Sequence, residues 1–178
     1  MKRSAIVVCV LAVATTSAVA LAGGNKVKET LTGYDESPSV STVASGVFNA
    51  TISKDESQID WQLSYAGLEG AVQQAHIHIG QVGVNGGITV FLCTNLGNGP
   101  AGIQACPDPP ATISGTILAA DVSPNIAATL PARNQGLGTG EIDELIAAIR
   151  AGATYVNVHS TTWPGGEIRS QIDKGHNH

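Results

Sequence analysis

The sequence predicts an all-β fold, an antiparallel Greek-key-like β-sandwich with one short covering helix at about 140–151. Four observations carry this prediction. Glycine, threonine and branched aliphatic residues are frequent, charged residues make up only 13% of the chain, and a single stretch has a good helical pattern. Several short segments alternate polar and apolar residues, which is the period of a strand with one buried face.

The start of the chain has the features of a signal peptide. Lys2 and Arg3 are followed by an unbroken apolar run and by small residues typical of a cleavage site. The apolar run is too short to predict a membrane anchor. We therefore expect a secreted or periplasmic protein, divided into a signal peptide at 1–22, one β-sandwich domain at 23–174 and a histidine-containing tail at 175–178.

The charge of the chain argues against two classes of partner. The formal net charge is -5, and it falls to -7 when Lys2 and Arg3 leave with the signal peptide. The sequence has no basic patch, so neither nucleic acid nor an anionic membrane is an expected partner.

The first half of the domain is predicted as three strands joined by turns. In segment 59–65 every second residue is large and apolar and the residues between are polar, so this strand has one buried face. Segment 46–52 alternates in the same way, and a turn at 54–57 joins the two into a hairpin. A shorter strand at 27–32 comes first and ends in a turn-like stretch at 33–38.

The second half contains further strands, a long loop and the helix. Strands are expected at 74–79, 88–92, 111–118, 154–159 and 167–172, with a glycine-rich link at 80–87, a loop at 93–110 and an irregular stretch at 121–140. The helix follows from Ile142, Leu145, Ile146 and Ile149, whose spacing gives one apolar stripe. Gly152 can end it.

Two cysteines remain once the signal peptide is removed. Cys93 and Cys106 lie close together in the sequence, at the start of the loop and within it. In an oxidising compartment such a pair is expected to form a disulfide that closes a local loop. A thiol metal site is the alternative, and export argues against it.

Two histidines share one face of a predicted strand. His76 and His78 lie two residues apart in the alternating segment 74–79, so both imidazoles point to the same side. A third histidine, His159, lies in segment 154–159. Whether the two strands are neighbours in the sheet does not follow from the sequence.

The parity of the last hairpin places His159 on a polar face. The valines and isoleucines of its two strands share one parity and are expected in the core. The opposite faces then carry Asn157 and His159 from one strand and Glu167 and Arg169 from the other. A symmetric turn would bring His159 close to Glu167 and Asn157 close to Arg169.

Together these residues could form a metal site. Imidazole nitrogen suits copper and zinc, and three histidines leave a coordination position open. Copper is favoured and zinc is the alternative; Glu167 is a candidate fourth ligand, and Glu167, Asn157 and Arg169 are candidate outer partners that orient the histidines. The other interpretation is a polar patch in which the histidines only hold loops together.

These segments resemble the CHRD domain of chordin-type proteins. The resemblance rests on residues 31–38, 45–46, 75–80, 83–86, 155–159 and 164–169. The chain departs from the usual pattern at the opening motif, where Pro38 stands without a second proline, and at Ser170, where a glycine is common. The resemblance implies an extracellular β-sandwich module, found in a growth-factor antagonist and as a secreted stand-alone domain, without a known reaction.

Three functional hypotheses follow. The first is a secreted metal-binding domain that uses His76, His78 and His159 for metal capture, delivery or a small redox role. The second is a non-enzymatic module that binds an extracellular protein or matrix, with structural histidines. The third is an enzyme similar to copper/zinc superoxide dismutase, which the lack of a further His/Asp cluster disfavours.

Overall fold

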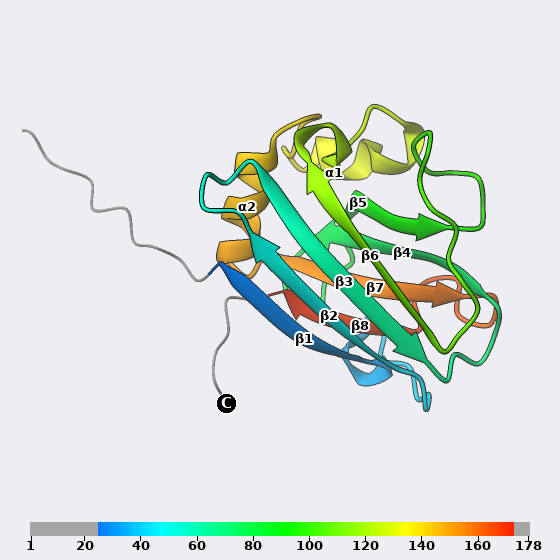
Figure 1. The fold of residues 1–178 in the computed structure, drawn as a ribbon. Coiled ribbons are helices and arrows are strands. Elements are labelled where there is room, and N and C mark those ends of the chain that lie inside the picture. The colour runs from blue at the N-terminus through cyan, green and yellow to red at the C-terminus, as the bar shows by residue number, and fades with distance from the viewer. Residues whose placement is uncertain (1–24, 173–178) are drawn as a thin grey trace, which may run out of the picture.

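The computed structural model describes residues 25–172, so the expected signal peptide and the tail at 175–178 lie outside the described residues. This part of the chain forms eight strands and two α-helices (Figure 1). The strands are β1 (Lys26–Thr32), β2 (Ser45–Ile52), β3 (Gln58–Ala66), β4 (Val72–Ile79), β5 (Gly87–Thr94), β6 (Ala111–Leu118), β7 (Thr154–Ser160) and β8 (Ile168–Ile172). The helices are α1 (Leu130–Asn134) and α2 (Ile142–Arg150), with 3-10 turns η1 (Gly33–Asp35), η2 (Ala119–Asp121) and η3 (Ala127–Thr129).

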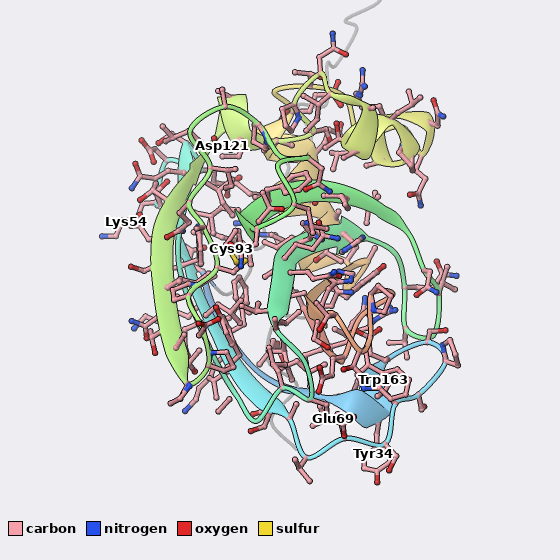
Figure 2. The ribbon with its side chains drawn as sticks, turned by 90° about the vertical axis from the view of Figure 1, so that its right-hand side faces the viewer. Tyr34, Lys54, Glu69, Cys93, Asp121 and Trp163 are labelled. Atoms are coloured by element: carbon pink, nitrogen blue, oxygen red, sulfur yellow. A yellow bond between two sulfur atoms is a disulfide. The ribbon has the colours of Figure 1, made fainter. Side chains whose placement is uncertain are left out.

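The strands belong to one antiparallel sheet in the order β5-β4-β7-β8-β1-β2-β3-β6. The sheet folds over on itself, so that the half containing β4 and β5 faces the half containing β2, β3 and β6 (Figure 2). The predicted antiparallel all-β class is confirmed. The two layers are joined through β8 and β1, whose register pairs Thr32 with Arg169. At the opposite seam, Nε2 of Gln104 donates to the carbonyl oxygens of Leu92 on β5 and Ser114 on β6.

The apolar core lies between the two halves of the sheet. On β3 the predicted alternation is confirmed, since Ile59, Trp61, Leu63 and Tyr65 are all buried. In the other half, alternate residues of three strands lie in the same core: Ala75 and Ile77 on β4, Val156 and Val158 on β7, and Ile168 and Ile172 on β8. Side chains of the opposite parity on β4, β7 and β8 therefore lie on the outer face of that half.

The predicted helix is α2, and its apolar stripe is buried through Leu145, Ile146 and Ile149. It lies at one end of the sheet (Figure 1) and is followed by Gly152, whose φ of 65° suits glycine after a helix. The irregular stretch before it contains η2, η3 and α1, and α1 was not predicted. Within residues 25–172, no helix has the length and apolar character needed to cross a membrane.

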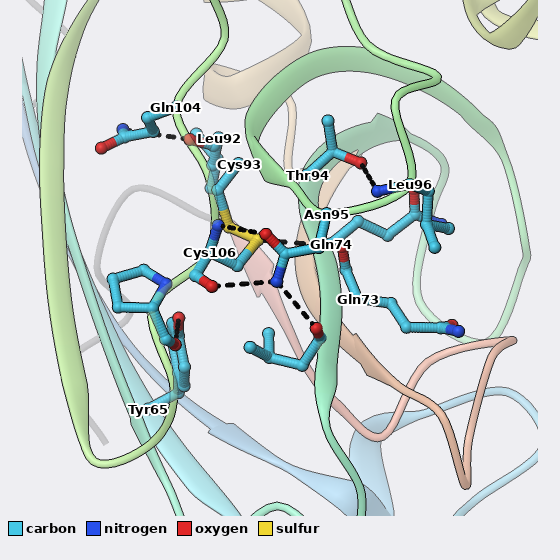
Figure 3. Close-up of a disulfide and its surroundings, with 12 residues drawn as sticks. Tyr65, Gln73, Gln74, Leu92, Cys93, Thr94, Asn95, Leu96, Gln104 and Cys106 are labelled. Atoms are coloured by element: carbon cyan, nitrogen blue, oxygen red, sulfur yellow. Dashed lines mark hydrogen bonds between the residues drawn. A yellow bond between two sulfur atoms is a disulfide. The ribbon is translucent and has the colours of Figure 1, made fainter.

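The predicted disulfide between Cys93 and Cys106 is present (Figure 3). Asn95 reinforces the same closure, because its Nδ2 donates to the carbonyl oxygen of Cys106 and its Oδ1 accepts from the Cys106 amide. The disulfide thus ties the loop after β5 back to the end of that strand.

Candidate metal centre

Strands β4 and β7 are neighbours in the sheet. Their antiparallel register pairs His76 with Asn157 and His78 with Tyr155, and His159 follows two residues after Asn157. This pairing supplies the adjacency that the sequence left open. Because Ile77 lies in the core, the histidine side chains of β4 lie on the outer face of the sheet.

The three histidines meet on that face. One ring nitrogen each of His76, His78 and His159 lies within 4.8 Å of the other two, and among the described residues this is the one such group of at least three potential ligands. The centroid of the His76 ring lies 5.4 Å from that of His78 and 5.1 Å from that of His159. All three side chains are buried, with exposed fractions of 0%, 6% and 6%.

Backbone hydrogen bonds fix the tautomers of two rings. Nδ1 of His78 lies 2.9 Å from the carbonyl oxygen of Gly86, and Nδ1 of His159 lies 3.0 Å from that of Pro164. A carbonyl oxygen only accepts, so Nδ1 carries the proton in both rings and Nε2 keeps its lone pair. Metal-ligating histidines are commonly oriented in this way.

Several nitrogens of the cluster are buried without a hydrogen-bond partner. Within the described residues, this holds for both ring nitrogens of His76 and for Nε2 of His78. Buried polar atoms normally find a partner, because leaving one unmatched is unfavourable by about 1–3 kcal/mol. A metal ion bound by these nitrogens would supply that partner.

Burial lowers the pKa of all three imidazoles. It brings the pKa of His78 to about 3 and that of His159 to about 4. The pKa of His76 falls well below its usual value through burial first, and then through the neighbouring His159 and His78. The rings are therefore neutral at neutral pH, which is the form that binds a metal ion.

Aromatic rings and one arginine surround the cluster. The ring of Phe91 meets that of His76 edge-on at 4.5 Å, and the ring of Tyr155 stacks on that of His78 at 4.6 Å. The guanidinium carbon of Arg169 lies 3.4 Å from the centroid of the Tyr155 ring. Arg169 also donates to the carbonyl oxygens of Gln81 and Val84, so it holds the link between β4 and β5 against this face.

Glu36 is a buried acid near the site that sequence reasoning did not select. Its segment reads as a solvated turn, yet the side chain is buried and its Oε1 accepts from Nδ2 of Asn157 at 3.5 Å. Burial raises the pKa of Glu36 to about 7, while Arg169 and Asn157 act in the opposite direction. The one sequence signal was its place in the opening motif of the resemblance.

Asn157, Arg169 and Glu167 were predicted to orient the histidines, and their side chains make different contacts. The pairing of Asn157 with Arg169 across β7 and β8 is as predicted, and Nε2 of His159 lies 3.0 Å from Oδ1 of Asn157. Glu167 is buried, and its Oε1 accepts from Oγ1 of Thr42 and from the amide of Glu69. These bonds direct that carboxylate oxygen toward the connection between β1 and β2 and the connection between β3 and β4.

Comparison with known proteins supports the family resemblance drawn from the segments that contain the three histidines. A family model for the CHRD domain matches residues 27–172, which contain all three histidines, Glu36 and the disulfide. The comparisons found no match among curated proteins and none among solved structures. The family match covers most of the chain and takes in the sheet from β1 to β8, so this chain belongs to the CHRD-domain family.

Proposed function

We propose that this chain is a secreted domain that binds one transition-metal ion through His76, His78 and His159. The observation that carries this proposal is the convergence of three neutral, buried imidazoles within 4.8 Å. Two of them are held by backbone carbonyls with Nε2 available. The role is metal capture or delivery, or a small redox site.

Copper is the favoured metal and zinc the alternative. Imidazole suits both ions, and the affinity of a given nitrogen site generally rises along the first-row divalent metals to a maximum at copper. The ligand set contains no thiolate, because Cys93 and Cys106 are joined in the disulfide.

An extracellular location has its own support. A disulfide persists in an oxidising compartment, and the CHRD domain is an extracellular type of module. The expected signal peptide at 1–22 supplies the route. N-terminal sequencing of protein collected from the culture medium or periplasm would check both the location and the cleavage site.

Metal titration of the tagless mature protein tests the proposal. After chelator treatment, we expect one equivalent of Cu(II), Cu(I) or Zn(II) to bind, and His76→Ala or His159→Ala to weaken binding at least about tenfold. The double variant His176→Ala/His178→Ala is the control, because it removes two histidines outside the proposed site. Binding that is unaffected by the first two variants would refute the metal site and favour a protein- or matrix-binding module with structural histidines.

A further inference from the structure

Asn157 brings an oxygen atom to the histidine cluster. It lies on β7 opposite His76, it is only 2% exposed, and its Oδ1 is 3.0 Å from Nε2 of His159. The amide oxygen therefore lies against the ring of one proposed ligand, on the strand that pairs with the strand of the other two.

The contact between Asn157 and His159 joins two acceptors. The proton of the His159 ring is on Nδ1, which donates to Pro164, so Nε2 has a lone pair, and an amide oxygen has no proton to donate. A second proton on the ring would create a cation in a buried cluster, which is unfavourable. A metal ion bound to both atoms satisfies both lone pairs, since ligands about 2 Å from one ion lie about 3 Å from each other.

Glu36 holds the amide group in this orientation. Oε1 of Glu36 accepts from Nδ2 of Asn157, which turns Oδ1 toward the histidines. Gly166 packs directly behind this pair. A Cβ atom at Gly166 would lie 2.2 Å from Oε1 of Glu36 and 2.9 Å from Nδ2 of Asn157.

We infer that Asn157 is itself a metal ligand, whose Oδ1 completes a set of three nitrogens and one oxygen with His76, His78 and His159. This inference rests on the proposed function and extends it. An amide oxygen is a harder ligand than imidazole, and sets of nitrogen and oxygen suit Cu(II) and Zn(II). The site would accordingly hold a divalent ion in preference to Cu(I).

Two substitutions at one position test the assignment. Asn157→Leu keeps the shape and removes the oxygen, whereas Asn157→Asp keeps an oxygen and adds a negative charge. We expect Asn157→Leu to weaken Cu(II) binding about tenfold or more, and Asn157→Asp to retain or tighten it. With Co(II) as a spectroscopic probe, the visible absorption of the loaded protein should change in the Leu variant, because the number of ligands changes.

The competing arrangement gives the opposite result. If the amide group is turned so that its NH₂ donates to Nε2 of His159, it competes with the metal for that nitrogen. Asn157→Leu would then leave the affinity unchanged or raise it, with the wild-type Co(II) spectrum, and this would overturn the inference while the three-histidine site stands. A wild-type protein that binds Cu(I) but no divalent ion would overturn the inference alone, and one that binds none of Cu(I), Cu(II), Zn(II) and Co(II) would overturn both proposals. Asn49→Leu on β2 is the matched control, and thermal unfolding of each apo variant checks the fold.

Discussion

Gly166 leaves room for the Glu36 carboxylate because glycine has no Cβ atom. Its φ is 128°, a conformation that favours glycine, and a Cβ atom there would collide with the Glu36 carboxylate. We expect Gly166→Ala to lower the free energy of unfolding by about 1–3 kcal/mol and to weaken metal binding, because Glu36 and Asn157 must both move. Gly165→Ala is the control, since no atom lies within 4 Å of its would-be Cβ. Equal urea midpoints for the two variants would contradict the expectation.

Glu36 also makes the stability of the apo protein depend on pH. Burial raises its pKa from 4.5 in the unfolded chain to about 7 in the folded chain, so the folded state holds this proton more tightly. The resulting stability is fully present below pH 4.5 and is lost as the pH rises through about 7. Glu36→Gln cannot lose a proton. Relative to wild type it should gain stability between about pH 5 and pH 8, by at most ~3 kcal/mol.

Urea unfolding of both proteins at several pH values measures this difference. The sign matters more than the size, because Gln also changes the hydrogen bond with Asn157. A difference in unfolding free energy between Glu36→Gln and wild type that stays constant from about pH 5 to pH 8 would rule out a raised pKa at this position.

At the scale of strands, the sequence predicts on which face of its strand a side chain lies, but it does not predict which strands pair in the sheet. The alternation in β4 and β7 correctly put His76, His78 and His159 on polar faces, because side-chain parity is a local property. The pairing of β4 with β7 joins segments about eighty residues apart, and no local pattern encodes it. Of the site residues, Glu36 was missed for the same reason, since a turn-like segment gives no sign that it packs over a distant sheet.

The helical elements show the same limit. The stripe of α2 spans more than two turns and was predicted, whereas α1 has five residues, starts with Leu130 and Pro131, and is too short to show a period. Its position is set by packing near β5, where a Cβ atom at Gly87 would lie 2.1 Å from the backbone nitrogen of Ala132. Only tertiary contact defines such an element.

The disulfide is predicted to stabilise the loop after β5. Replacing both cysteines by Ser removes the link without leaving a free thiol, and the chain-entropy account gives a loss of about 2–3 kcal/mol for a loop of this size. The histidines lie on β4 and β7, which keep their own pairing, so metal binding should persist at saturating metal. Thermal unfolding with and without dithiothreitol tests the loss: reductant should lower the wild-type midpoint and leave the double variant unchanged.

For the whole molecule, the notable feature is a second set of buried side chains, which lies on the outer face of one half of the sheet. One half of the sheet has an apolar inner face and an outer face that carries histidines, Asn157 and Arg169, all of them buried beneath the connecting segments. Buried polar groups stabilise a fold only when they are matched. Arg169 is matched by backbone carbonyls, while the nitrogens of His76 are not. The outer face therefore has unmet hydrogen-bonding capacity at the proposed metal site.

This arrangement couples acid stability to metal binding across the domain. The folded pKa values of His78 and His159 are about 3 and about 4, below the 6.5 of the unfolded chain, so their contribution is present above pH 6.5 and is lost as the pH falls. Each proton bound only by the unfolded state removes ~1.4 kcal/mol per pH unit. Between pH 4.5 and about 7, the raised pKa of Glu36 changes the stability in the opposite direction. Glu36 is a single group, whereas all three histidines of the cluster have lowered pKa values.

We therefore expect the apo protein to lose stability steeply below about pH 6. A bound metal ion should lower the pH at which half of the protein is unfolded. Free metal at a hundred times its dissociation constant adds ~2.7 kcal/mol to the folded state. Acid titrations followed by circular dichroism, with and without Cu(II), measure both effects. His76→Gln should make the apo transition less steep and abolish the shift caused by metal, whereas His176→Ala/His178→Ala should change neither. A metal-induced shift that survives in His76→Gln would place the bound ion elsewhere on the protein.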